Sequence, residues 1–194
     1  MGQQHPSLKP RMLDDLMRMS DFSADELKIW YNEFSKDSVS GFLSKNDFIK
    51  IYKGLFPHGD ASGFADHVFR TFDANKDGVL NFREFVIGLS LTMKGPLDDK
   101  LYWAFKLYDV DGNGFVTKDE MNEIIAVSNA IFTVCCTDTT DDDVIMSGRE
   151  AFKTMDTDED GKVSWGEFRK GIHSNRVFML IVEAKMKNAG VTSR

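Results

Sequence analysis

The chain has 194 residues, of which 42% are hydrophobic and 12% aromatic, which suffices for a packed core and one or two domains. Its 31 Asp and Glu against 24 Lys and Arg give a net charge of -7, which argues against nucleic acid as a partner. It has neither an apolar stretch long enough to span a membrane nor the apolar core of a secretory signal, so we expect a cytoplasmic protein.

The N-terminus carries an incomplete lipidation signal. Gly2 follows the initiator methionine, as N-myristoylation requires, but that signal has Ser or Thr at position 6, where this chain has Pro6. The first two residues alone therefore give weak support for a myristoyl group on Gly2. If the group is attached, nearby basic residues would add attraction to anionic lipid: Lys9, Arg11 and Arg18.

One twelve-residue loop pattern recurs along the chain, in degenerate form at 36–47 and in full at 73–84, 109–120 and 156–167. The full copies match the EF-hand calcium loop, in which short polar side chains stand at positions 1, 3, 5 and 9 and glutamate at position 12. Such a loop offers a hard cation about six to eight oxygens, including the backbone carbonyl of position 7, and Gly at position 6 permits the sharp turn.

The degenerate loop, 36–47, is expected to fold without binding metal. Gly41 keeps position 6, but Lys36 stands where the first carboxylate belongs. Asp47 replaces the final glutamate and is one methylene shorter. The two aromatic residues before this loop also lie one residue out of step with those of the other units, so we expect the entering helix to meet this loop differently.

The three complete loops predict three Ca²⁺ sites. Glutamate at position 12 can reach back with both oxygens, which favours the larger Ca²⁺ and leaves Mg²⁺ as a competitor. The predicted ligands are Asp73, Asn75, Asp77, Val79, Asn81 and Glu84; Asp109, Asp111, Asn113, Phe115, Thr117 and Glu120; and Asp156, Asp158, Asp160, Lys162, Ser164 and Glu167.

Helix-spaced apolar residues flank each complete loop. They stand one and four positions before the loop and directly after it, which places them on one face of an entering and an exiting helix. These residues are Phe69, Phe72 and Phe85; Phe105, Tyr108 and Met121; and Phe152, Met155 and Phe168.

The expected fold is all-α and compact, with four EF-hand units paired into two lobes. Units one and two would form residues 1–94, and units three and four would form residues 95–194 with a C-terminal helix. Gly95 and Pro96 interrupt the helical pattern between the lobes. The apolar stretch 177–182 reads as the last amphipathic helix, which either covers a groove or packs on the second lobe.

Catalysis is not expected from this sequence. The four histidines have no metal-ligand spacing, and we find neither a nucleophile motif nor a phosphate-binding glycine loop. Cys135 and Cys136 read as reduced apolar residues, although a redox switch or acyl attachment stays open. The acidic segment 137–143 reads as a solvated connection.

Apolar surface decides between a calcium sensor and a calcium buffer, because only a sensor opens a groove for a partner helix when Ca²⁺ binds. The first lobe is rich in aromatic residues, which could line such a groove or serve only as core. The groove candidates are Trp30, Phe34, Phe48, Tyr52, Phe56, Phe85 and Leu89.

Four longer segments resemble the neuronal calcium sensor family, and this resemblance covers nearly the whole chain. They are Ile29-Trp30-Tyr31, the segment from Leu55 to Asp60, the segment from Phe64 to Asp73, and the segment from Trp103 to Asp109.

The resemblance implies a disabled first loop and a first-lobe groove for target helices. It also implies regulation of receptor kinases, lipid kinases, channels or cyclases, and a myristoyl group on Gly2 that Ca²⁺ expels for reversible membrane contact. We expect a monomer or weak dimer. Ser38-Val39 departs from the usual Cys-Pro of the family's first loop, although Lys36 and Asp47 still leave that loop without its ligands.

Overall fold

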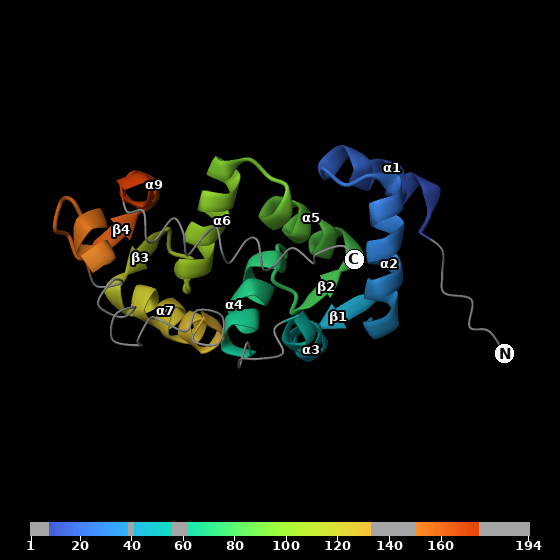
Figure 1. The fold of residues 1–194 in the computed structure, drawn as a ribbon, viewed down its shortest axis with the longest axis horizontal. Coiled ribbons are helices and arrows are strands. Elements are labelled where there is room, and N and C mark those ends of the chain that lie inside the picture. Colours follow the sequence, from blue (N-terminus) through green and yellow to red (C-terminus); the bar gives the residue numbers. More distant parts are fainter. Residues whose placement is uncertain (1–7, 39–40, 56–61, 133–149, 175–194) are drawn as a thin grey trace.

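Helices dominate the computed structural model, which describes residues 8–38, 41–55, 62–132 and 150–174. Four three-residue strands accompany the helices in the described ranges (Figure 1). Residues 150–155 are also helical and enter the last loop. The elements are α1 (Pro10–Met19), α2 (Ala24–Asp37), β1 (Phe42–Ser44), α3 (Lys45–Leu55), α4 (Ser62–Phe72), β2 (Val79–Asn81), α5 (Phe82–Met93), α6 (Leu97–Tyr108), β3 (Phe115–Thr117), α7 (Lys118–Phe132), β4 (Lys162–Ser164) and α9 (Trp165–Ser174).

Short antiparallel strands pair the loops two by two. β1 pairs with β2, with Leu43 opposite Leu80, and β3 pairs with β4, with Val116 opposite Val163. All four of these side chains are fully buried. The strands therefore join unit one to unit two and unit three to unit four, and the predicted all-α fold of paired EF-hand units is confirmed.

The first unit differs where its entering helix meets the loop. α4 and α6 end one residue before position 1 of their loops, whereas α2 continues to Asp37, which is position 2. Phe34 still reaches the core, at 2% exposure. The different entry that the out-of-step aromatics predicted is therefore present.

Helix α1 was not predicted from the sequence. Pro10 occupies its first turn, where a missing N–H costs nothing, and Leu16 is buried at 2% exposure. α1 packs against α2 and α5 while Met17 and Met19 stay exposed. The sequence does carry a signal for this helix, a proline followed by apolar residues at helical spacing, but the pattern spans only ten residues.

Aromatic rings fill both lobes. In the first lobe, Phe48 meets Phe69 and Phe72 with ring centroids 5.7 and 5.8 Å apart. In the second lobe, Phe105 and Phe168 lie 5.3 Å apart in an edge-on arrangement. Such pairs stabilise a core by about 0.5 to 1.5 kcal/mol each beyond the burial of their area. They come from entering and exiting helices, so they set how the helices cross beside each loop.

Lys94 fastens the start of the connection between the lobes to the first lobe. Its amino group lies 2.7 Å from a Glu26 carboxylate oxygen, donates to the Asp21 carbonyl, and lies 4.6 Å from the Phe22 ring centroid. The Lys94 hydrogen bond, with those from Ser23, lowers the pKa of Glu26 to about 2. These contacts hold the residue after α5 against the first lobe, three residues before α6 begins at Leu97.

Candidate metal centres

The three complete loops share one backbone conformation. Their position-6 glycines, Gly78, Gly114 and Gly161, have φ of 82°, 88° and 84°. Position 4 also has a left-handed backbone in each loop. It is a glycine only in loop 109–120, as Gly112, whereas Lys76 and Glu159 adopt φ of 59° and 58° in the other two loops. A residue with a β-carbon adopts such angles at a cost, so the conformation is imposed by the loop as a whole.

The aspartate at position 1 organises each loop by accepting two backbone N–H groups. One oxygen accepts from position 5 and the other from the position-6 glycine, and both are aimed at the loop centre. The distances are 3.2 and 2.9 Å for Asp73, 3.0 and 3.0 Å for Asp109, and 3.1 and 3.1 Å for Asp156.

Positions 3 and 5 close a second layer of turns. The side-chain oxygen at position 3 accepts the N–H of position 5, and that at position 5 accepts the N–H of position 7. In the first complete loop these bonds are 3.0 Å from Asp77 N to Asn75 and 3.0 Å from Val79 N to Asp77. The position-7 side chain is free for other contacts: Lys162 lies over the Phe115 ring at 4.3 Å and so ties the last two loops together.

The glutamate at position 12 caps the exiting helix together with position 9. Glu84 accepts the N–H of Asn81 at 3.1 Å, and Asn81 accepts the N–H of Glu84 at 3.0 Å. Glu120 and Glu167 make the same reciprocal pair and also accept a hydroxyl at 2.8 Å, from Thr117 and Ser164. This capping box fixes the glutamate at the start of the exiting helix, facing the loop.

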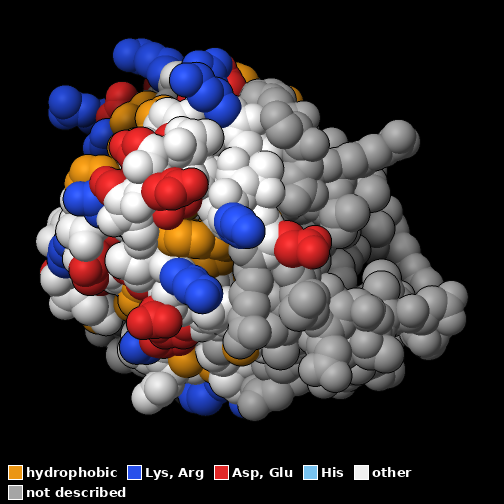
Figure 2. Space-filling view, turned by 90° about the vertical axis from the view of Figure 1, so that its left-hand side faces the viewer, with side chains coloured by type: hydrophobic (Ala, Val, Ile, Leu, Met, Phe, Trp, Pro, Cys, Tyr) orange, Lys and Arg blue, Asp and Glu red, His pale blue; other side chains and the backbone are white. Residues whose placement is uncertain are grey.

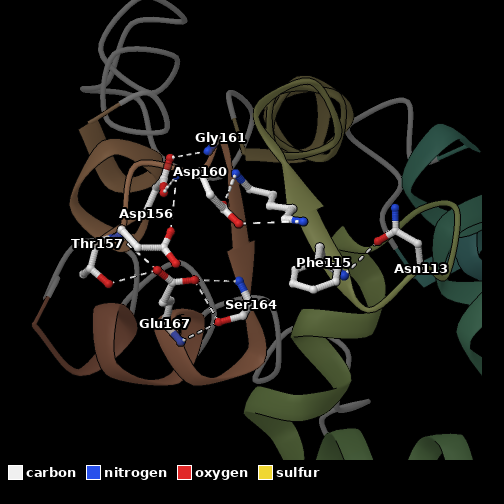
Figure 3. Close-up of polar contacts among 10 residues, drawn as sticks. Asn113, Phe115, Asp156, Thr157, Asp160, Gly161, Ser164 and Glu167 are labelled. Atoms are coloured by element: carbon white, nitrogen blue, oxygen red, sulfur yellow. Dashed lines mark hydrogen bonds and ion pairs between the residues drawn. The ribbon is translucent and has the colours of Figure 1, made fainter.

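Two of these glutamates also reach the beginning of their loops. Glu120 Oε1 accepts the N–H groups of Val110 and Asp111 at 2.9 and 3.2 Å. Figure 3 shows the Glu167 carboxylate between Ser164 and Thr157. This carboxylate accepts the Thr157 N–H at 3.0 Å and the Thr157 hydroxyl at 2.9 Å. These bonds, led by the one from the Ser164 N–H, lower the pKa of Glu167 to about 2.

The geometry of these two loops fits a calcium ion. Carboxylate oxygens of Asp109, Asp111 and Glu120 all lie within 4.8 Å of one another, as do those of Asp156, Asp158 and Glu167. Oxygens that each lie about 2.3 to 2.6 Å from one Ca²⁺ can be at most about 5 Å apart. Around the loops at this end of the molecule, acidic side chains are interspersed with Lys and Arg on the described surface (Figure 2).

Loop 73–84 has the same turns, but its position-12 glutamate makes fewer hydrogen bonds than those of the other two complete loops. Its position 3 is Asn75, so it offers one carboxylate fewer at the loop start. In the hydrogen bonds of the described residues, Glu84 bonds with Asn81 alone and does not bridge to Ala74 or Asn75. The sequence pattern, which is complete in all three loops, did not predict this difference.

The degenerate loop uses its polar residues for other contacts. Lys36 at position 1 pairs with Glu33 at 2.6 Å. Asp47 at position 12 accepts the Ser44 hydroxyl at 2.6 Å and lies 3.1 Å from Lys50, and these hydrogen bonds, Ser44 first, lower the pKa of Asp47. The strand in this loop still pairs with β2, as a scaffold for loop 73–84 requires.

Most of the predicted groove residues lie in the core in this conformation. Phe34, Phe48, Tyr52 and Phe85 are between 2% and 8% exposed. Trp30 and Leu89 are partly buried against the same core. Phe56 and Gly2 lie outside the described residues, as do both cysteines and the segments 137–143 and 177–182.

A cavity of about 280 Å³ lies beside α1, and the sequence did not indicate it. Its lining combines basic side chains with the apolar face of the helix. Arg83, next to Glu84, approaches Met19 at 3.0 Å between its guanidinium and the sulfur atom. The lining residues are Lys9, Arg11, Met12, Asp15, Leu16, Met19 and Arg83.

None of the described helices combines the length and apolar character needed to cross a membrane.

Comparisons with known proteins match this architecture. Residues 98–173 match the EF-hand domain pair family and residues 64–88 the EF hand family. Recoverin of Homo sapiens is 36% identical over 193 residues, which covers 94% of this chain and 96% of recoverin. S-modulin of Aquarana catesbeiana is 38% identical over 91% of this chain and 89% of S-modulin. Visinin of Gallus gallus is 36% identical over 96% of this chain and 100% of visinin.

These matches extend over both lobes and over all three complete loops. EF-hand sequence and acidic loop geometry together indicate calcium binding. Relatives more than one third identical over nearly the full length confirm the resemblance that the aromatic segments indicated. The chain belongs to the neuronal calcium sensor family of EF-hand proteins.

Proposed function

We propose that this protein is a Ca²⁺ sensor that binds three ions, in loops 73–84, 109–120 and 156–167, and regulates a target protein. The observation that carries the proposal is the convergence of carboxylate oxygens in loops 109–120 and 156–167, which Glu120 and Glu167 close. Mg²⁺ would compete weakly, because loops with a long position-12 glutamate suit a larger ion with more ligands.

The switch would begin at Glu84. An ion in loop 73–84 would draw the Glu84 carboxylate toward Asp73, and α5, which starts two residues earlier at Phe82, would move with it. α5 carries Phe85, whose ring centroid lies 6.2 Å from that of Trp30. Movement of α5 would separate these rings and open a groove for an amphipathic target helix. The family resemblance points to receptor kinases, lipid kinases, channels or cyclases as target classes.

A calcium buffer is the second candidate, and the burial of the groove residues favours it. Phe34 and Phe85 are core residues in this conformation, and a buffer would keep them so. An environment-sensitive apolar fluorophore separates the two functions. A sensor should raise the fluorescence when Ca²⁺ is added, and Glu84→Gln should reduce that gain more than the scaffold-loop control Asp47→Asn. Unchanged fluorescence on adding Ca²⁺ would support the buffer.

Reversible membrane contact is a further part of the proposed function. Lys9, Arg11 and Arg83 line the cavity beside α1, and Lys9 stands seven residues after Gly2 in the sequence. One myristoyl chain alone binds membranes marginally, so basic residues would supply the second attraction. When the parent chain carries the lipid, Gly2→Ala, which cannot be N-myristoylated, should lose Ca²⁺-dependent partition into anionic vesicles and keep target binding. Equal partition of both proteins would contradict this part of the proposal.

A further inference from the structure

The two lobes meet along α4, the helix that enters loop 73–84. α4 packs against α6 and α7, which enter and leave loop 109–120 (Figure 1). His67 on α4 lies 3.4 Å from Glu123 on α7, and the Trp103 indole N–H on α6 donates to the Thr71 hydroxyl at 3.0 Å. Loops 73–84 and 109–120 therefore stand on opposite sides of one shared interface.

Arg70 on α4 reaches into the second lobe. Its guanidinium donates to the backbone carbonyls of Asp109 at 2.8 Å, Leu107 at 2.9 Å and Lys106 at 3.2 Å. α6 ends at Tyr108, so these carbonyls belong to the helix end, where no intrahelical donor is left for them. Arg70 thus caps the C-terminus of a helix in the other lobe.

The capped end leads directly into an ion ligand. Asp109 is position 1 of loop 109–120, is 6% exposed, and holds the N–H groups of Asn113 and Gly114 with its side chain. Its carbonyl is fixed by Arg70 and its carboxylate by the loop, so both ends of the residue are positioned. Arg70 itself stands three residues before Asp73, position 1 of the other loop.

The same two loops also lie near each other at position 4. A β-carbon built on Gly112 would lie 3.8 Å from the Lys76 amino nitrogen, so position 4 of one loop approaches position 4 of the other. The side chains that occupy the place of Arg70 in units three and four do not bridge the lobes in the described residues. Lys106 lies over the Tyr102 ring of its own helix at 4.8 Å, and Lys153 is exposed.

We propose that Arg70 is a positioning residue for the ion site at 109–120 and couples that site to the site at 73–84. When an ion tightens loop 73–84, the last turn of α4 shifts, and Arg70 carries the shift to the Asp109 carbonyl. The inference rests on the proposed binding of Ca²⁺ by both loops. Couplings of this kind typically change affinity by about 5 to 150-fold and are reciprocal.

The test is a double-mutant cycle in the full-length chain carrying Glu167→Gln, which leaves two complete loops. Calorimetric titration with Ca²⁺ gives the affinity of loop 109–120 with and without Glu84→Gln, first with Arg70 and then with Arg70→Lys. Lysine keeps the charge but cannot cap three carbonyls with one planar group. With Arg70 present, Glu84→Gln should lower the Ca²⁺ affinity of loop 109–120 by about 5-fold or more. With Arg70→Lys, the ratio of this affinity without and with Glu84→Gln should approach one.

Thr71→Val is the matched control, because it removes the Trp103 hydrogen bond at the same interface without touching the α6 carbonyls. It should leave the ratio unchanged. An equal ratio in the Arg70 and Arg70→Lys backgrounds would overturn the inference while leaving ion binding intact. Failure of the Glu167→Gln parent to bind two ions would instead overturn the proposed function. Arg70→Met serves as a second variant: if loop 109–120 still binds but the ratio persists, the inference is also overturned.

Discussion

Glu120→Gln should lower the number of Ca²⁺ ions bound per chain from three to two. The substitution removes one of the three carboxylates that converge in loop 109–120 and leaves a single oxygen where two could bind. We expect the affinity of that loop to fall on the order of 100-fold, since ligand charge and ligand number both decrease. Titration calorimetry under chelator-controlled Ca²⁺ measures both quantities.

The scaffold loop provides the control for this experiment. Asp47 occupies the same position 12 in loop 36–47 but hydrogen-bonds with Ser44 and lies beside Lys50. Asp47→Asn should therefore leave three ions bound with unchanged affinities. If Asp47→Asn also removed an ion, loop 36–47 would be a binding loop and the scaffold role would be wrong. If Glu120→Gln retained three ions, the assignment of Glu120 as a ligand would fail.

Loop geometry was the part of the molecule most open to prediction. Each turn in the loops is closed by bonds between residues two to five apart, such as Asp109 with Gly114, so a local pattern carries the information. The pairing of unit one with unit two followed from the need of each unit to bury its apolar face, and β1 pairs with β2 in the structure. The turns of the loops need no knowledge of distant segments.

Individual side-chain contacts between distant segments could not be predicted from the sequence. Arg70 caps carbonyls 36 to 39 residues away, and a basic residue near a helix end carries no sign of that partner. Glu84 and Glu120 occupy identical positions in the pattern, yet only Glu120 reaches the start of its loop. The aromatic residues of the first lobe could not be assigned, because a groove lining and a core have the same composition and spacing.

The different reach of the glutamates suggests how work is divided between the lobes. Glu120 and Glu167 already bridge their loops, so ion binding there requires little movement. In the proposed switch, Glu84 would have to move toward the start of its loop, and α5 would move with it. Under the proposed function, the second lobe would mainly bind ions, and the first lobe would convert binding into a change of shape.

The close approach of α4 and α5 makes Gly88 the most sensitive small residue of the first lobe. A β-carbon at Gly88 would lie 2.6 Å from three atoms of the Phe72 ring, far inside van der Waals contact. Phe72 is 6% exposed and packs on Phe48, so it has little room to move away. Overpacking costs about 1 to 3 kcal/mol, against up to about 1 kcal/mol gained from the helix propensity of alanine.

We therefore expect Gly88→Ala to lower the free energy of unfolding by about 1 to 2 kcal/mol, measured by urea denaturation in chelator. Gly166→Ala is the matched control, because the nearest atom to its β-carbon is the Ser164 hydroxyl oxygen at 4.0 Å. That control should be as stable as the parent or more stable by up to about 1 kcal/mol. If Gly88→Ala were as stable as Gly166→Ala, α4 and α5 could not approach as closely as the structure shows. The proposed switch would then begin from a lobe in which α5 stands further from α4.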